Sequence, residues 1–419
     1  MTDSLWILNP SGQTTAGAFI DDTLAARVAE GGMRDRWPLV AAFPRQRVEV
    51  VRGIDPVAEV SRLFDLRGWT DGLPIVAPTT GRVAEMLDYT PFARDAVIGE
   101  LDPLKGLASV EKLAINALMA GCRPDYFPIL IAAVQAIAEP EFNLRGVQTT
   151  DENVTPLVLV NGPIARQIGM NDSFGCLGPG WRSNATIGRA LRLVMQNIGG
   201  GWPSVVAFAG LGQPGKFTLC FPENEMQSPW APFHVDAGFA ADQNVVTVLR
   251  AESAINVTGG LEEVASVMGS AASAFSWLHG GIVTVAISPA TAAALDRDGI
   301  SKAEARVWLH QNGRISSEEL KSLWIYNNAG KAKEWPDWTL KAIDAGRVPP
   351  VEDPDKITLV VAGGNIPIAQ QAYFPTWGYP DCRIMKEVAL PTGWQPINEE
   401  MTGGDDLATL MTCWWWAAA

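Results

Sequence analysis

Residues 245–287 read VVTVLRAESAINVTGGLEEVASVMGSAASAFSWLHGGIVTVAI, and this stretch decides the fold class. It begins with an apolar run, 245–250, whose length and β-branched composition are typical of a buried strand. Apolar residues at helical spacing predict a helix over 261–275, and a second apolar strand is expected at 282–287. A strand, a helix long enough to cross over and another strand indicate an α/β fold.

The same alternation extends in both directions from this stretch. Toward the C-terminus, helices are predicted at 290–296 and, after the cap Ser301, at 302–311, followed by a helical insert at 316–345 and a strand at 357–362. Toward the N-terminus, strands are predicted at 47–51, 73–77, 96–99, 156–160, 205–209 and 216–221, and helices at 57–66, 83–87, 110–120, 127–138 and 187–198.

This order predicts an α/β protein of mainly parallel or mixed sheets with crossover helices, arranged as two packed domains. The expected divisions are an N-terminal lead-in at 1–55, a first α/β domain at 56–242, a second at 243–395 and a C-terminal tail at 396–419. A chain of 419 residues has room for two domains of ordinary size.

Composition excludes several classes of protein. With 47% hydrophobic and 19% charged residues, the chain has the balance of a compact enzyme rather than of a disordered protein. A net charge of −14 argues against a nucleic-acid partner and against an anionic membrane surface. No apolar run reaches the length of a membrane span, and the first residues lack the pattern of a secretory signal. Five scattered cysteines without a CxxC pair fit a reducing compartment, so we expect a cytoplasmic protein.

A glycine-rich loop, GCLGPGWRSN at 175–184, leads into the helix predicted at 187–198. Backbone N–H groups in such a loop and at a helix start can bind a carboxylate or phosphate, and nearby arginines would add charge. Residues expected to bind substrate here are Gly178, Gly180, Arg182, Asn184 and Arg189. The loop lacks the Walker A ending and does not directly follow a strand, so no nucleotide cofactor is expected. The alternative is a capped helix with a tight lead-in.

The segment CFPENEMQSPWAPFHVD, at 220–236, gathers reactive side chains after a predicted strand. Glu223 and Glu225 would face the same side of an extended chain, and a close carboxylate pair raises one pKa into the range useful for proton transfer. His234 could orient the pair or titrate with it, and Asn224 and Trp230 are expected to contact substrate. The same set could instead bind a divalent metal. The alternative is a solvated acidic loop.

Three smaller features complete the candidates. Asp71, in the turn WTDGLP at 69–74, is either a substrate contact or a local acceptor for backbone N–H groups. Gly363, Gly364 and Asn365 directly follow the strand predicted at 357–362, where open α/β sheets bind ligands, and the alternative is that they form a simple turn. Cys176 and Cys220 are the candidate reactive thiols.

Several blocks of the sequence resemble a family of uncharacterised bacterial proteins associated with UGSC-motif (seleno)proteins. They are WTDGLP (69–74), VEKLAINA (110–117) with AGC (120–122), NATIGRA (184–190), LGQPGKFTLCFPENEMQSPWAPFH (211–234) and GISK (299–302). The resemblance covers most of 60–390 and implies functional roles for Glu223, Asn224, Glu225 and His234, but no particular reaction. This chain has no UGSC or CGSC tetrad, so the resemblance assigns no thiol or selenol role to any of its residues.

Together these features favour an enzyme that acts on a small, anionic molecule by acid–base chemistry of carboxylates and a histidine, of hydrolase or lyase type. One alternative is a redox protein that uses Cys176 or Cys220 with a separate thiol or selenol partner. Another is a non-catalytic binding or scaffold protein. Three consecutive tryptophans in MTCWWWA, at 411–417, are costly to leave in water and therefore predict a homo-oligomer with the tail in a neighbour's groove. The alternative is that the tail packs on its own chain.

Overall fold

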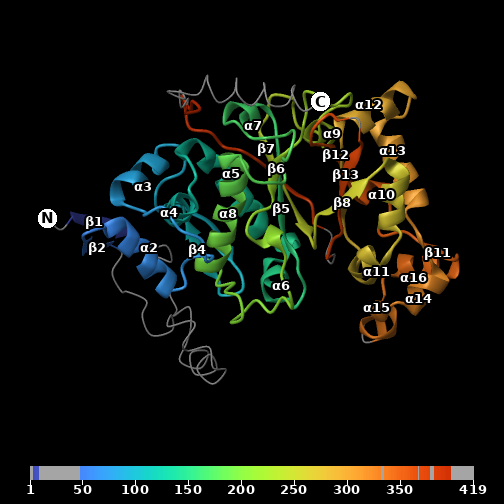
Figure 1. Ribbon diagram of the computed structural model, residues 1–419, viewed down its shortest axis with the longest axis horizontal. Helices are drawn as coiled ribbons and strands as arrows, with labels where there is room; N and C mark the ends of the chain where they lie inside the picture. The colour runs from blue at the N-terminus through green and yellow to red at the C-terminus, as the bar shows by residue number, and fades with distance from the viewer. Residues whose placement is uncertain (1–2, 9–47, 332–334, 367, 378–381, 398–419) are drawn as a thin grey trace, which may run out of the picture.

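Two four-stranded sheets lie face to face at the centre of the molecule, and helices cover the outer face of each (Figure 1). The computed structural model describes residues 3–8, 48–331, 335–366, 368–377 and 382–397, with side chains from residue 50 onward. Within these residues the layers follow the order helix, sheet, sheet, helix.

The two sheets are both mixed. The first has the order β14 (Ile384–Glu387), β7 (Val245–Ala251), β5 (Thr155–Asn161) and β6 (Cys220–Pro222), in which only the β5–β6 pair is parallel. The second has the order β12 (Ile357–Val361), β9 (Val283–Ile287), β13 (Gln370–Phe374) and β8 (Ile255–Thr258), in which only the β12–β9 pair is parallel. The predicted α/β class with mixed sheets is confirmed, and antiparallel pairs outnumber parallel ones.

The layering explains why the central strands are apolar along their whole length. All seven residues of β5 are buried, and successive side chains point to opposite faces of the sheet. Val158 and Val160 pack among the helices, whereas Leu157 and Leu159 pack against residues of the second sheet. A strand with both faces covered needs hydrophobic side chains at every position, which is why the sequence shows a continuous run.

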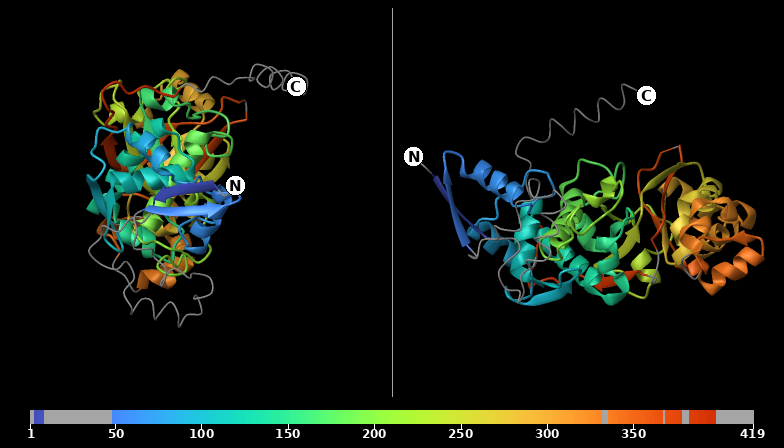
Figure 2. Two further views of the ribbon diagram at one scale, coloured as in Figure 1. Left: turned by 90° about the vertical axis from the view of Figure 1, so that its left-hand side faces the viewer. Right: turned by 90° about the horizontal axis from the view of Figure 1, so that it is seen from below.

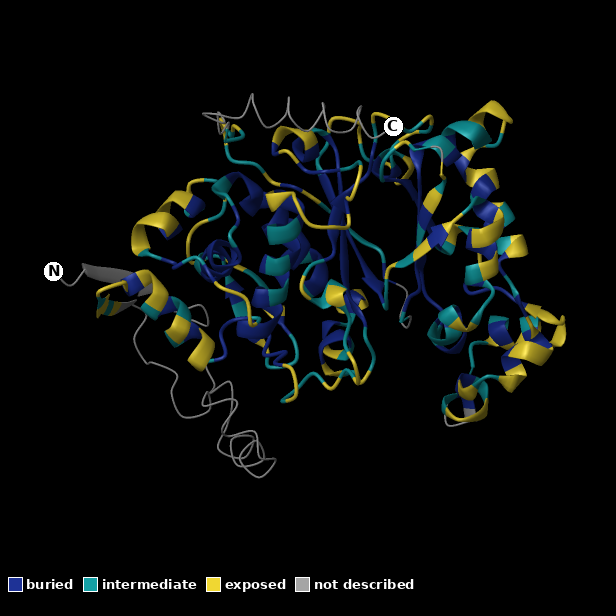
Figure 3. Ribbon diagram, viewed as in Figure 1, coloured by how far each residue is buried: buried dark blue, intermediate teal, exposed yellow. Residues whose placement is uncertain are grey.

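The helices are divided between the two outer layers (Figure 1). The first sheet is covered by α4 (Val110–Ala120), α5 (Phe127–Ala138) and α8 (Arg182–Asn197), and the second by α10 (Leu261–Met268), α12 (Pro289–Arg297) and α13 (Lys302–Asn312). Most residues of α4, α5 and α8 are buried, whereas α10, α12 and α13 also present exposed residues to solvent (Figure 3).

Shorter elements extend the molecule at both ends (Figure 2). Around the first sheet lie β1 (Asp3–Leu8), β2 (Val48–Gly53), α2 (Pro56–Leu66), α3 (Thr80–Leu87), β3 (Val97–Leu101), β4 (Gly106–Ser109), α6 (Leu144–Thr149) and α7 (Pro163–Gln167), whereas α9 (Phe233–Asp236) lies near β12 of the second sheet (Figure 1). Beyond the second sheet lie α11 (Ala274–His279), β10 (Ile315–Ser316), α14 (Ser317–Ser322), α15 (Trp324–Asn327), α16 (Asp337–Asp344) and β11 (Arg347–Val348).

Several predicted elements differ from the structure. Helices α4 and α5 have the predicted bounds, but α8 begins at Arg182, five residues before the predicted start at 187. Residues 73–77 and 205–209 form no strand, and the strand predicted at 216–221 shrinks to β6 after a short 3₁₀ turn. The helix predicted at 261–275 breaks at Gly269, where a side chain would meet the backbone of Arg314 within 2.9 Å. Short apolar runs have no periodicity by which to separate strand from loop.

The predicted boundary near residue 242 does not separate the two sheets. Strands β7 and β14 both lie beyond it in sequence, yet both belong to the first sheet with β5 and β6. The Trp-rich tail at 411–417 lies outside the described residues. No helix in the described part of the chain is both long and apolar enough to cross a membrane.

Candidate functional site

The ends of two parallel strands bring Asn161 and Glu223 together. Asn161 is the last residue of β5, and Glu223 directly follows β6, its parallel neighbour. The pairing continues one step past β6, because Glu223 N–H donates to the carbonyl of Val160 at 3.1 Å. Parallel strands end at the same edge, so residues 62 positions apart meet there.

The side chain of Asn161 holds two carboxylates at once. Its Nδ2 donates to Glu223 Oε2 at 2.6 Å and to Glu225 Oε1 at 2.9 Å. A second donor reaches each carboxylate from the backbone, from Phe233 N to Glu223 at 2.7 Å and from Gly162 N to Glu225 at 2.8 Å. We call Glu223 and Glu225 the carboxylate pair. The structure therefore brings together the two glutamates that the sequence nominated.

The two members of the carboxylate pair have different environments. The Glu223 side chain is completely buried, and burial raises the pKa of its carboxyl to about 7 against the attraction of Lys302. Its Oε1 has no hydrogen-bond partner among the described residues. The Glu225 side chain is 24% exposed, and its two hydrogen bonds both reach Oε1.

Lys302 and His234 complete the surroundings of the carboxylate pair. Lys302 begins α13 and its ammonium lies 3.9 Å from Glu223 Oε1 and 2.8 Å from Asp236, while also donating to the carbonyl of Ala231. His234, in α9, is fully buried with Nδ1 3.6 Å from Glu225 Oε1. Neither of its ring nitrogens has a hydrogen-bond partner within the described chain. Buried polar groups are usually hydrogen-bonded, so an imidazole beside a carboxylate with both nitrogens unbonded to the described residues is a candidate member of the site.

Asn224 links this cluster to the second sheet. Its N–H donates to the carbonyl of Val361, the last residue of β12, at 2.8 Å, and its Nδ2 lies 3.5 Å from the carbonyl of Gly363. The residues after β6 therefore reach the carboxyl end of β12 as well as that of β5. Asn224 is buried and contacts protein here.

A cavity of about 230 Å³ lies beside this junction, between the facing sheets. It is lined in part by the glycine-rich loop at Cys176 and Gly178 and by Gly363 and Gly364 after β12, two segments that the sequence nominated separately. Phe221 of β6 forms another wall, two residues before Glu223. Asn365, in the same turn, is exposed.

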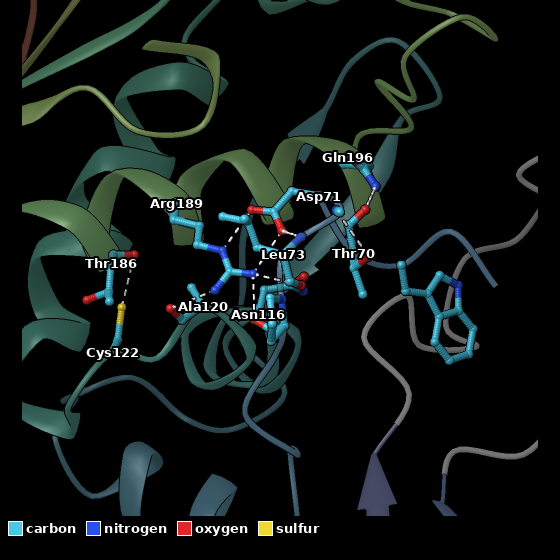
Figure 4. Close-up of polar contacts among 12 residues, drawn as sticks. Thr70, Asp71, Leu73, Asn116, Ala120, Cys122, Thr186, Arg189 and Gln196 are labelled. Atoms are coloured by element: carbon cyan, nitrogen blue, oxygen red, sulfur yellow. Dashed lines mark hydrogen bonds and ion pairs between the residues drawn. The ribbon is translucent and has the colours of Figure 1, made fainter. Parts of the chain in front are cut away.

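The charge of Arg189 is paired with a carboxylate of the protein. Its Nε and Nη2 form a two-point ion pair with Asp71 at 2.7 and 2.8 Å, and Nη2 also donates to the carbonyl of Pro74 at 2.9 Å (Figure 4). The Asp71 side chain is 4% exposed and also accepts from the N–H of Leu73. The expected anion clamp is therefore absent at Arg189, and Asp71 is a structural anchor for the turn.

Other loop residues are also used by the protein. Arg182 begins α8 and its Nε donates to the carbonyl of Gly121 at 2.8 Å. The buried Asn184 accepts from the N–H of Asn171 and donates to the carbonyls of Asn171 and Cys176, which fixes the loop. Gly180 is exposed at the turn before α8, and Trp230 packs on the core beyond the second sheet.

The cysteines have the environment of thiols rather than thiolates. Burial raises the pKa of Cys176 to about 11 and raises the pKa of Cys220 further. Among the described residues, Cys122, Cys176, Cys220 and Cys382 are buried and none of them forms a disulfide. No group of three or more His, Cys, Asp and Glu side chains in the described chain is arranged to hold a metal ion.

Sequence reasoning missed Asn161 and Lys302 as parts of the site. Asn161 directly follows the strand predicted at 156–160, and Lys302 is the first residue of the helix predicted at 302–311. A polar residue directly after a buried strand is a usable signal for Asn161. Lys302 ends the GISK block, but no local pattern shows its partners, because its ammonium reaches Asp236 of α9, the carbonyl of Ala231 and the vicinity of Glu223 only in the folded chain.

Comparisons with known proteins identify no relative of this chain. No family model matches the chain, and neither a curated protein nor a solved structure matches it.

Proposed function

We propose that this protein is an enzyme that acts on a small molecule by acid–base chemistry at the carboxylate pair, as a hydrolase or a lyase. One observation carries the proposal: a single amide, Asn161 Nδ2, holds two carboxyl groups in unlike environments. One is buried, with its pKa raised to about 7, and the other is partly exposed. Groups whose environments separate them in this way are suited to be the acid and the base of one reaction.

In this proposal Glu225 is the group that meets the substrate. Its Oε1 accepts from Asn161 and Gly162, which leaves Oε2 to take a proton from the substrate or from water. Glu223 is the buried member, and because its pKa is about 7 it can gain or lose a proton near neutral pH. His234, next to Glu225, would orient the carboxylate or share its proton. Lys302 limits the pKa of Glu223, because a positive charge at 3.9 Å favours the ionised carboxyl.

The other parts of the proposal rest on composition and on the surroundings of the site. The anionic substrate expected from the sequence loses the support of Arg189, which is paired with Asp71. A cytoplasmic address and the absence of a nucleic-acid partner rest on the scattered cysteines and the net charge of −14. The homo-oligomer rests on the Trp-rich sequence of the tail at 411–417.

The test is a screen of small esters, amides and hydroxy acids, with product formation followed by NMR for wild type and variants. Glu225→Gln should abolish any turnover that the wild type shows, whereas Glu223→Gln should change its dependence on pH. Glu262→Gln, an exposed glutamate of α10, is the matched control and should behave as wild type. Wild-type turnover by Glu225→Gln would refute the assignment.

A further inference from the structure

The cavity beside the carboxylate pair is lined by apolar and neutral polar residues. Phe174 and Leu177 of the glycine-rich loop, Phe221 of β6 and Ile366 after β12 supply apolar surface. Asn256 and Gln370, both exposed, bring side-chain amides to the cavity. None of the described residues that line it is charged.

The absence of charge in the lining limits what the cavity can hold. Moving an ionised group out of water is costly, and the described residues of this lining offer it no charge of opposite sign to offset that cost. The thiol of Cys176, which also lines the cavity, stays neutral near pH 7 because burial raises its pKa to about 11. A neutral apolar group meets no such cost and gains from leaving water.

The size and position of the cavity limit the ligand further. Its volume of about 230 Å³ exceeds the roughly 150 Å³ that suffices to hold a benzene ring. Phe174 and Leu177 are 51% and 42% exposed, so the loop presents apolar surface to an arriving molecule. Phe174 also lies against Gly364, where a Cβ would come within 2.3 Å of the ring. The wall can take this form only because residue 364 has no side chain.

We infer that this cavity binds an uncharged, ring-sized apolar group of the substrate, with the amides of Asn256 and Gln370 available to a neutral polar atom on it. The inference rests on the proposed function in naming this ligand a substrate. It replaces the anionic molecule expected from the sequence with a molecule whose recognised part is neutral. Phe221 and Glu223 are two residues apart, so the cavity lies near the carboxylate pair, although neither glutamate is among the described residues that line it.

The test uses two probes of nearly the same shape, benzamide and benzoate, titrated against the full chain and followed by NMR. Benzamide should bind at least ~10-fold more tightly than benzoate, since desolvating an unpaired carboxylate costs more than ~1.4 kcal/mol, the equivalent of tenfold. Ala372→Leu, which fills the cavity from β13, should weaken benzamide binding at least ~10-fold by the same conversion. Ala293→Leu, the same change at a half-buried alanine of α12 outside the cavity, should leave binding unchanged.

Phe174→Ala provides a second variant in case Ala372→Leu does not fold. Phe174 is half exposed, and its replacement by a smaller side chain forces no extra atoms into the protein. It should also weaken benzamide binding. Equal or tighter binding of benzoate overturns the inference. The inference is also overturned if a folded cavity variant binds benzamide with wild-type affinity. The same holds if neither probe binds up to its solubility limit. Binding does not require the carboxylate pair, so Glu225→Gln should keep wild-type affinity. If benzamide binds as expected and Glu225→Gln keeps its turnover, the proposed function is wrong but the inference about the cavity stands.

Discussion

At the scale of single residues, two charged groups, the partly buried Arg189 and the buried Glu223, are compensated to different degrees. Arg189 has a carboxylate partner, Asp71, with two-point geometry, so burial of both charges is compensated. Glu223 has donors for one oxygen only, and its nearest cation is 3.9 Å away. Full compensation is typical of a structural ion pair, whereas partial compensation shifts the pKa and leaves the group able to change its charge.

The first prediction concerns the stability of Glu223→Gln as pH changes. Because the folded-state pKa of Glu223 is raised from 4.5 to about 7, the folded protein loses stability as pH rises between these values. A shift of this size corresponds to roughly 3 kcal/mol at most. Glutamine does not ionise, so the variant should gain stability relative to wild type between pH 5 and pH 8. Urea unfolding at both pH values measures this, and a pH-independent difference would contradict the raised pKa.

The second prediction separates the two arginines that the sequence assigned to anion binding. Arg189→Ala leaves the carboxylate of Asp71 buried without its partner and should cost about 3–5 kcal/mol of unfolding free energy. Arg182→Ala removes an exposed side chain from the same helix and should cost under about 1.5 kcal/mol. Chemical denaturation of both variants provides the measurement. Similar small losses in both would mean that the Asp71 pair carries little stability.

At the scale of elements, helix α8 links the turn at Asp71 to the strand that precedes the carboxylate pair. Its Arg189 reaches Asp71, and its Gly188 lies against the backbone just before β6. A Cβ at position 188 would come within 2.3 Å of Thr218 Oγ1 and 3.0 Å of Leu219 N. The close approach of α8 to this segment therefore depends on glycine, and it helps to position β6 and hence Glu223.

The third prediction follows from that contact. Gly188→Ala should destabilise the protein by about 1–3 kcal/mol, because the helix or the strand must shift to admit a methyl group. Gly81→Ala, in α3, has nothing within 4 Å of the added Cβ and should stabilise by about 0.5–1 kcal/mol through helix propensity. Thermal unfolding compares the two. If both substitutions shifted stability in the same direction, the close packing of α8 would not be the cause.

At the scale of the whole molecule, the site occupies the place where the two sheets meet. Asn161 and Glu223 come from the first sheet, Gly363 from the end of the second, and Lys302 from the helix layer beyond it. Asn224 bonds to the second sheet from a segment that extends the first. Motion of one sheet against the other would therefore change the contact of Asn224 with Val361 and the distance from Lys302 to Glu223.

The fourth prediction concerns assembly. Residues 414–416 are three consecutive tryptophans, each of which buries roughly 150–250 Å² when packed. If they dock on a neighbouring subunit, deletion of 411–419 should convert the oligomer to a monomer while the described fold stays intact. Light scattering gives the mass and circular dichroism the fold. An unchanged mass, or a monomeric wild type, would remove the tail from any interface.

The sequence by itself determined the class of fold, most helices and the segment that contains Glu223, Glu225 and His234. Helices α4 and α5 show their apolar periodicity and their stop signals locally, and Glu223, Glu225 and His234 lie within twelve positions of one another. Only the tertiary structure decided the pairing of β7 with β5, the partner of Arg189, and the meeting of Asn161, Lys302 and the carboxylate pair. Those outcomes depend on contacts between residues far apart in sequence. The packing of two sheets and two helix layers brings these residues together, and no local sequence pattern predicts that packing.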